Sequence, residues 1–262
     1  MFRIAIDGTA AAGKGTLAKL CSKVLGFMYV DTGAMYRSVA MKALEAKVNE
    51  DDELSHAEIA QNIRFEFVWD GDELQIWVDG ENCSSKIRTE AVGDRASTSS
   101  AYPSVRSALL EQQRQLGRTQ NVIMDGRDIG TVVLPNAELK VYVDAQIEVR
   151  AQRRLLDVQQ KEATGEFERV LKDLKLRDHR DMNRKVAPLK KAADAKILDT
   201  TQQSIISGVE QVFKWYLAVR YPHLKNEQLK SILSSNESTV DLPKETLGQV
   251  ERLKDLIASQ KD

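Results

Sequence analysis

The residues with the clearest chemical potential lie near the N-terminus, at positions 8–16, which read GTAAAGKGT. Four residues separate Gly8 from Gly13 and Lys14 follows directly, which is the spacing of a loop whose backbone N–H groups surround the phosphates of a nucleotide. Glycine permits the close approach that such a loop needs, and Lys14 brings a point charge to the outer phosphates. The pattern predicts a nucleoside triphosphate site, although a glycine-rich turn after an edge strand would look similar.

Two more groups of polar residues follow short apolar segments. Residues 28–31 (MYVD) lead into Thr32 and Arg37, and residues 121–125 (NVIMD) end in Asp125. Because ligands of parallel α/β sheets gather at the carboxyl ends of the strands, we expect these side chains to lie beside the phosphate loop. Asp125 would then stand where a substrate or the shell of Mg²⁺ is usually held. Two alternatives stay open: Arg37 as a solvated helix residue, and Asp125 as a helix-capping or turn carboxylate.

Basic residues are concentrated between positions 147 and 191, where there are 13 lysines and arginines against 8 acidic residues. Arg177, Arg180 and Arg184 are spaced to share one helical face. Asp181 is close enough in sequence to orient Arg177 and Arg184. A charge-rich helix is usually only a solvated surface. Beside a phosphate site, however, converging arginines are what transfer of a phosphoryl group requires.

A sheet is needed to bring these residues together, and the sequence contains its strands. Five short segments read as strands of one parallel sheet, with helical patterns between them: 2–6, 28–31, 121–125, 139–143 and 196–198. The first runs directly into the phosphate loop. Residues 17–25 after the loop show helical periodicity, so the loop has the strand and the helix that it requires.

A different pattern interrupts this alternation between the second and third strands. Residues 64–69 and 74–78 alternate apolar with polar residues on either side of the turn sequence DGD. A short third strand is expected near residues 82–87. The pattern predicts an antiparallel subdomain inserted into an α/β core, followed by helices at 88–100 and 103–116.

Composition excludes several classes of protein. In 262 residues, 38 basic and 39 acidic side chains leave a net charge of −1, which provides no field for nucleic acid or a membrane surface. The two cysteines form no CxxC pair and support neither a disulfide framework nor a zinc site. No segment has the apolar length of a membrane span or the layout of a signal peptide. We therefore expect a cytoplasmic protein without nucleic-acid or membrane partners. A monomer is also expected, although the sequence does not reveal the oligomeric state.

After a final core helix at 202–221, the chain continues into a tail whose role the sequence does not indicate. Its helical patterns lie at 224–233 and 244–258, separated by the polar run SSNEST. The second pattern has a single apolar stripe, made of Leu247, Val250, Leu253 and Ile257. We expect this stripe to pack on the protein's own core rather than on a partner.

The ordered set IAIDGTAAAGKGT, YVDTGAMYR, IRTEAVG, MDGRDIGTVV and RDHRDMNRKVAPL resembles the bacterial cytidylate kinases over residues 3–215. The ending GKGT is typical of nucleoside monophosphate kinases, whereas most GTPases and ATPases have GKS or GKT. The resemblance implies an α/β, P-loop nucleoside monophosphate kinase fold. This fold has a five-stranded parallel sheet flanked by helices, an antiparallel β insert in the monophosphate-binding subdomain, and a helical lid.

The same resemblance implies a division of the chain. A kinase domain would cover residues 1–221, with its core in 1–37, 118–150 and 192–221. The monophosphate-binding subdomain would lie at 38–117 and the lid at 151–191. The helical tail, 222–262, falls outside the resemblance.

Residue roles are implied position by position. ATP would be bound by Gly8, Thr9, Ala10, Ala11, Ala12, Gly13, Lys14, Gly15 and Thr16. The CMP phosphate would be held by Thr32, Arg37 and Arg127, the cytosine by Ser97, Arg106, Asp128 and Arg184, and the ribose by Arg177 and Asp181. The lid would contribute Arg153, Arg154 and Arg180. The catalytic residues would be Lys14, Arg127, Arg153 and Arg180.

The resemblance also implies how Mg²⁺ is bound, and the phosphate loop departs from the family pattern. Mg²⁺ would arrive with ATP without a direct protein ligand, Thr16 being the candidate if there is one. The loop departs from the family in having Thr9 and a run of alanines where Pro and a third Gly are frequent, which should stiffen it.

The implied reaction is in-line transfer of the γ-phosphoryl group of ATP to CMP or dCMP, in pyrimidine nucleotide metabolism. Positioning and charge neutralisation would carry it, since the acceptor is already an anion. Two other classes remain as alternatives. A guanine-nucleotide switch would need an NKxD sequence and a DxxG after a strand, which the chain lacks. A kinase for a sugar or shikimate-like acceptor is usually shorter and has no hairpin insert of this kind.

Overall fold

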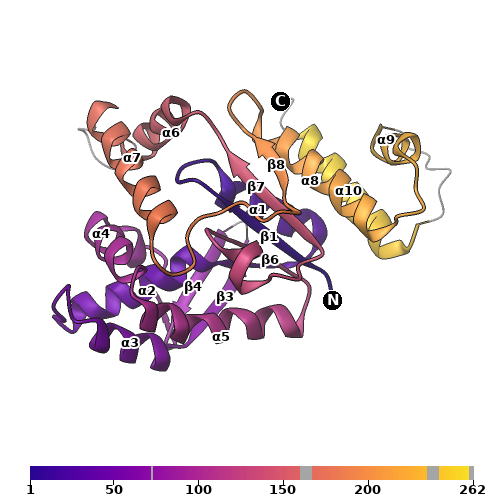
Figure 1. Ribbon diagram of the computed structural model, residues 1–262. Helices are drawn as coiled ribbons and strands as arrows, with labels where there is room; N and C mark the ends of the chain where they lie inside the picture. The colour runs from indigo at the N-terminus through magenta and orange to yellow at the C-terminus, as the bar shows by residue number, and fades with distance from the viewer. Residues whose placement is uncertain (72, 160–166, 235–241, 260–262) are drawn as a thin grey trace.

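The fold is built on a five-stranded parallel sheet (Figure 1). The computed structural model describes residues 1–71, 73–159, 167–234 and 242–259. The strand order is β2–β6–β1–β7–β8. The strands are β1 (Arg3–Gly8), β2 (Met28–Asp31), β6 (Val122–Gly126), β7 (Leu139–Asp144) and β8 (Lys196–Asp199). All five predicted strands are therefore confirmed, each within two residues of its expected bounds.

The register of the sheet places several carboxylates at one edge. Asp31 pairs with Asp125, Asp7 pairs with Gly126, and Asp144 pairs with Asp199. These residues stand at the carboxyl ends of their strands, because all the pairings are parallel. The ligand-binding edge expected from the sequence is thus lined by acidic side chains, and any anion bound there needs cations from other elements.

Helices cover both faces of the sheet, and the alternation along β1 shows how. Ile4 and Ile6 point into one apolar cluster, which includes α1 (Lys14–Leu25) and α8 (Ile205–Arg220). Ala5 points into a second cluster. That cluster contains residues of α2 (Thr32–Glu45), α3 (Glu53–Asn62), α4 (Glu90–Ser99) and α5 (Pro103–Thr119). Successive strand side chains face opposite sides, so a strand buried on both faces is apolar throughout.

The predicted insert is confirmed as a second, antiparallel sheet with the order β3–β4–β5. Its strands are β3 (Phe65–Asp70), β4 (Glu73–Val78) and β5 (Glu81–Asn82), and the turn η1 (Lys86–Arg88) follows. The third strand is shorter and earlier than expected. Ile87 lies in η1, where its side chain is fully buried, so burial rather than strand pairing accounts for the apolar residue.

Two helices cross the phosphate-loop end of the sheet: α6 (Ile147–Gln159) and α7 (Phe167–Asn183). Val170 and Leu174 of α7 and Ala151 of α6 form a small apolar cluster with Ala10 of the phosphate loop. The helix α7 ends at Asn183, so Arg184 lies beyond it, whereas the sequence placed Arg177, Arg180 and Arg184 on one helical face. The chain turns there because Leu189 N–H donates to the carbonyl oxygen of Asp181.

The tail packs on the core through its last helix, which confirms the expected docking (Figure 1). The tail helices are α9 (Asn226–Ser234) and α10 (Lys244–Ala258). Val250 and Leu253 are buried against the cluster that contains α1 and α8, whereas Leu247 of the same predicted stripe is 39% exposed. Gln249 and Arg252 donate to the carbonyl oxygens of Leu25 and Val24, so polar contacts at the end of α1 supplement the stripe. None of the described helices is long and apolar enough to cross a membrane.

Candidate active site

The phosphate loop connects β1 to α1, and two of its glycines are required by its shape. A Cβ on Gly8 would lie 1.8 Å from the carbonyl oxygen of Val143 in β7, so only glycine fits between the strands. Gly13 precedes the first residue of α1 with a φ of 83°, a conformation that disfavours other residues. The N-terminus of α1 therefore follows the loop directly, and its free N–H groups favour an anion there.

Lys14 is the buried cation of this loop. Its side chain is only 5% exposed, and Nζ donates to the carbonyl oxygen of Thr9 at 2.5 Å. Burial lowers the pKa of Lys14, and repulsion from the guanidinium groups of Arg127 and Arg177 lowers it further. A bound phosphate would offset this repulsion, so the site is arranged for an anion.

Asp125 lies at the end of β6, beside the phosphate loop. Tyr29 Oη donates to Asp125 Oδ1 at 2.9 Å, and Asp125 Oδ2 lies 3.9 Å from where a Cβ on Gly15 would be. Burial and the negative charge of Asp31 raise the pKa of this carboxyl. Thr32 Oγ1 donates to the backbone oxygen of Asp125 at 2.7 Å, which joins the ends of β2 and β6. Asp125 is therefore a carboxylate held next to the loop, not a helix cap.

Asp128 is a buried acidic residue that binds two arginines. Arg106 Nη2 donates to Asp128 Oδ2 at 2.6 Å, and Arg184 Nη2 donates to Oδ1 at 3.0 Å. Asp128 is 5% exposed and Arg106 is 6% exposed. The guanidinium group of Arg106 also stands 5.3 Å from the centre of the Tyr36 ring. Side chains from α5 and the segment after α7 thus converge on one carboxylate, and Tyr36 of α2 packs against the first of them.

Asp7 holds the segment that carries Asp128. Its two carboxylate oxygens accept the backbone N–H groups of Ile129 and Gly130, each at 2.7 Å. These residues begin the short π-helical turn η2 (Ile129–Val133). Burial raises the pKa of Asp7 to about 6, although the two N–H groups act in the opposite direction.

Arg127 and Arg177 bring positive charge to the space in front of the loop. Arg127 Nε donates to Asp181 Oδ2 at 2.8 Å, so Asp181 orients Arg127 rather than Arg177 and Arg184, for which no hydrogen bond to it is found in the described chain. The pKa of Arg177 is lowered by desolvation and by repulsion from Arg127, Arg37 and Arg154.

The remaining arginines predicted for the site differ in how they are held. Arg37 Nη2 donates to Asp31 Oδ2 at 2.8 Å, and its buried Nε atom has no partner within the described residues. Arg153 donates to both the hydroxyl and the backbone oxygen of Thr200, after β8. Arg154 and Arg180 are exposed on α6 and α7. The guanidinium group of Arg37 is therefore oriented by Asp31 at the end of β2, whereas that of Arg153 is bound to Thr200 after β8.

Most of the predicted arginines and carboxylates take part in these contacts, whereas the side chains of Thr16 and Ser97 do not. The hydroxyl-bearing Thr16 is exposed on the first turn of α1. Ser97 is half-buried on α4, and its backbone oxygen accepts the Ser100 hydroxyl, so its own side chain is not committed by that contact.

Sequence reasoning missed several residues that shape the site. Asp7, Asp31, Tyr29 and Tyr36 all lie inside or beside the quoted motifs, so the motifs themselves were a signal. Asp178 also lies inside a quoted motif, RDHRDMNRKVAPL, although no role was predicted for it. Arg150 gave no signal, because it is one charged residue in a charge-rich region. Both are buried, and both contact the phosphate loop.

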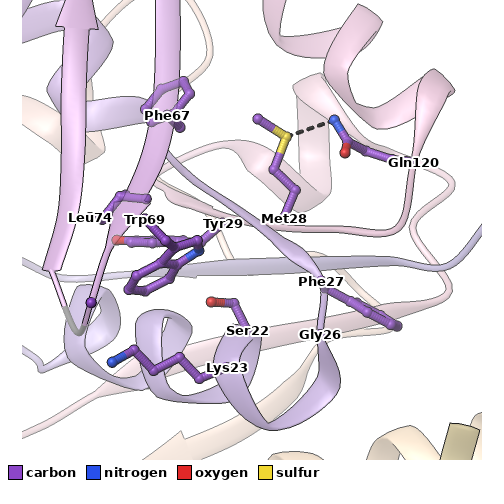
Figure 2. Close-up of a pocket in the computed structure, with 11 residues that line it drawn as sticks. Ser22, Lys23, Gly26, Phe27, Met28, Tyr29, Phe67, Trp69, Leu74 and Gln120 are labelled. Carbon is purple, nitrogen blue, oxygen red and sulfur yellow. Dashed lines mark hydrogen bonds between the residues drawn. The ribbon is translucent and has the colours of Figure 1, made fainter.

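A cavity of about 560 Å³ lies elsewhere, between the end of α1, the start of β2 and the β3–β4 hairpin. Figure 2 shows Trp69, Phe67 and Leu74 of the hairpin on one side of it, and Ser22 and Lys23 of α1 on another. The Lys23 ammonium stands 5.0 Å from the centre of the Trp69 ring. None of the predicted site residues lines this cavity. An aromatic wall without converging arginines does not suit phosphoryl transfer, so we place the active site at the phosphate loop.

The fold and the site define a P-loop nucleoside monophosphate kinase. The features that define it are the parallel sheet, the loop after its first strand, the antiparallel insert and the arginines around one edge. The sequence model of the family described as Cytidylate kinase matches residues 4–217. This chain belongs to that family.

Similar proteins named cytidylate kinase support the assignment. The protein of Pasteurella multocida (strain Pm70) is 44% identical over 81% of this chain and 93% of its own length. That of Actinobacillus succinogenes is 45% identical over 81% of this chain and 96% of its own. The protein of Pectobacterium carotovorum is 46% identical over 77% of this chain and 90% of its own length. These relationships favour a kinase over the switch and the sugar-kinase alternatives, and the family match ends before the tail.

Proposed function

We propose that this chain phosphorylates CMP and dCMP with ATP, by in-line transfer of the γ-phosphoryl group. The observation that carries the proposal is the pairing of two sites at one sheet edge. One is a buried lysine in a phosphate loop, and the other is a buried carboxylate between two arginines. The first suits the triphosphate donor, and the second suits a base that carries an amine.

The donor would lie along the phosphate loop and the N-terminus of α1. Backbone N–H groups and Lys14 would neutralise the charge of the β- and γ-phosphates. Arg127 would stand between donor and acceptor, since its charge already reaches Lys14 and its Nε is fixed by Asp181. Arg153 and Arg180 would complete the neutralisation if α6 and α7 close over the substrates, which would also exclude water.

The acceptor would lie between α2, α5 and η2. Thr32, Arg37 and Arg127 would hold its phosphate, and Arg177 with Asp181 would face the ribose. Asp128 would accept a hydrogen bond from the N4 amine of cytosine, because a carboxylate oxygen retains acceptor capacity after binding one arginine. Arg106, Arg184 and Ser97 would face the acceptor edge of the base. No general base is needed, since the acceptor phosphate is already ionised at neutral pH.

Kinases of this family transfer phosphoryl groups from ATP, generally with Mg²⁺, and the residues present fit such an ion. Gly15 leaves open the space between the loop and Asp125 that a side chain would fill. Asp125 and the exposed hydroxyl of Thr16 are oxygen donors, the type that Mg²⁺ prefers, and we propose that they hold it through water. No group of three acidic, histidine or cysteine side chains suited to a metal occurs among the described residues. When bound, the ion would neutralise phosphate charge.

We keep the division of the chain as part of this proposal. The core would be 1–37, 118–150 and 192–221, the monophosphate-binding subdomain 38–117, and the lid 151–191. Part of that lid, residues 160–166, lies outside the described residues. The cytoplasmic location, the monomeric state and the absence of nucleic-acid and membrane partners stay predictions.

The test is ADP production from Mg·ATP with CMP, dCMP, UMP, AMP and dTMP supplied in turn. We expect strong turnover with CMP and dCMP, and weak turnover or none with the purine and thymine nucleotides. Stimulation by AMP or dTMP but not by CMP would overturn the proposed acceptor and the roles of Asp128 and Arg184. The ATP site would then remain as proposed.

A further inference from the structure

One buried ion pair outside the predicted site, Arg150–Asp178, binds the backbone of the phosphate loop. Asp178 of α7 accepts the backbone N–H of Ala10 through Oδ1 at 3.1 Å. Arg150 of α6 donates from Nη1 to the backbone oxygen of Ala10 at 3.0 Å. The same Nη1 donates to Asp178 Oδ2 at 2.5 Å, and Arg150 Nε donates to the backbone oxygen of Ala145. Both polar groups of Ala10 are therefore held by one pair of side chains.

The location of these contacts matters for the shape of the loop. The N–H of Ala10 belongs to the peptide group before it, and its carbonyl oxygen belongs to the peptide group that leads into Ala11. Ala11 has a φ of 58°, a left-handed conformation that is unfavourable for alanine. A backbone conformation of this kind persists only where the surroundings fix it. Arg150 and Asp178 fix the peptide groups on both sides of Ala10.

Burying this ion pair also has a large desolvation penalty, so it adds little to the stability of the contact between α6 and α7. Arg150 is 5% exposed and Asp178 is 6% exposed, and burying an ion pair adds little stability compared with apolar side chains. Ala10 itself packs against Ala151 of α6 and against Val170 and Leu174 of α7. A shift of either helix would therefore move the loop. The same helices carry Arg153 and Arg180, which neutralise the phosphates in the proposed function, and Arg177, which faces the ribose there.

We propose that Arg150 and Asp178 are positioning residues, which hold the phosphate loop in its nucleotide-binding shape and couple that shape to the placement of α6 and α7. The inference rests on the proposed function for the identity of the donor nucleotide and does not depend on the acceptor. Neither residue touches the predicted substrates. They act through the backbone of Ala10, so their loss should weaken the binding of adenine nucleotides before any transfer takes place.

The main test is the double variant Arg150→Met/Asp178→Leu in the full chain. Apolar side chains of similar size often replace a buried ion pair without loss of stability, so the variant should fold. We expect the Kd of Mg·ADP, measured by calorimetry without CMP, to rise about tenfold, because two hydrogen bonds that shape the loop are lost. The KM of ATP should rise more than the KM of CMP. An ADP Kd within twofold of the unaltered chain would overturn the proposal, even with a lower melting temperature.

A second pair of variants keeps the test decisive if the double variant fails to fold. Asp178→Asn retains an oxygen for the Ala10 N–H, whereas Asp178→Ala removes it. We expect Asp178→Asn to bind ADP more tightly than Asp178→Ala, and equal affinities would overturn the proposal. The matched control is Arg3→Met/Glu138→Leu, which removes an ion pair that lies away from the loop and should leave ADP affinity unchanged. ADP binding without CMP-stimulated turnover in the unaltered chain would refute the proposed acceptor alone.

Discussion

Arg106 and Asp128 form an ion pair of 2.6 Å whose side chains are 6% and 7% exposed. The pair joins α5 to the turn after β6, and a second arginine, Arg184, binds the other oxygen of the same carboxylate. Asp7 fixes the backbone next to Asp128, and the two arginines hold both oxygens of its carboxylate. A group of this kind can discriminate between bases by hydrogen bonding, since a base that lacks the matching donor would leave it unsatisfied.

Replacing Asp128 by asparagine tests the base-reading role. Asparagine keeps the size but not the charge, so Arg106 and Arg184 lose their shared counter-ion. We expect kcat/KM for CMP to fall about 10²-fold or more while the KM of ATP changes little, because a buried charged hydrogen bond is lost on the acceptor side. The measurement is steady-state kinetics with each substrate varied. Asp194→Asn, which alters an exposed carboxylate bound to Lys140, should leave both constants unchanged.

Replacing Lys14 by methionine tests the donor side. Methionine fills most of the volume of the lysine but cannot neutralise phosphate charge. We expect kcat to fall about 10²- to 10³-fold, the usual cost of losing one preorganised charge-stabilising group. Lys86→Met in the insert, far from the loop in the fold, is the control. A Lys14→Met enzyme with near-normal kcat would contradict the assignment of the loop.

The pH dependence of stability tests the burial of Asp7. Its pKa is raised from 3.8 to about 6 in the folded state, so between these values the folded chain binds more protons than the unfolded chain. Stability from this group is therefore full below about pH 4 and is lost as pH rises through 6, by roughly 2–3 kcal/mol.

Urea unfolding of the unaltered chain and of Asp7→Asn at several pH values from 4 to 7 provides the measurement. As pH rises from 4 to 7, the unfolding free energy of the unaltered chain should fall relative to that of Asp7→Asn. Asp125 titrates in both proteins and cancels from the difference. A difference that is flat, or that rises with pH, would show that Asp7 is ionised throughout.

Deleting residues 222–262 tests the docking of the tail. The deletion removes the buried side chains of Val250 and Leu253 and the hydrogen bonds of Gln249 and Arg252 to the end of α1. We expect the melting temperature to fall by about 5–10 °C, since loss of one buried leucine alone costs about 2–5 kcal/mol. Leu253→Ala should reproduce part of the loss, whereas Leu247→Ala on the exposed side of α10 should not. An unchanged melting temperature after the deletion would show that the docked tail does not stabilise the core.

The amino-acid sequence by itself determined the elements and the phosphate loop. Continuous and alternating apolar runs located the five parallel strands and the β3–β4 hairpin, because the side chains of a strand alternate between its two faces. The short strand β5 has no such run and was placed less well. The loop followed from Gly8, Gly13 and Lys14, because glycine and lysine at that spacing meet a local backbone requirement. Even the docking of α10 could be expected from its stripe, since the packing of an amphipathic helix depends on one face alone.

Only the tertiary structure decided which charged side chains belong together. Asp181 was expected to orient its helical neighbours, but it binds Arg127, 54 residues away. Neither Arg150 nor Asp178 had a predicted role, and only folding places both against Ala10. The reason is that a single charged residue leaves no periodic pattern in the sequence, whereas apolar residues do. Its partner depends on where elements that are distant in the sequence meet in the fold. The partner also depends on burial, because the exclusion of water makes an ion pair specific in its geometry.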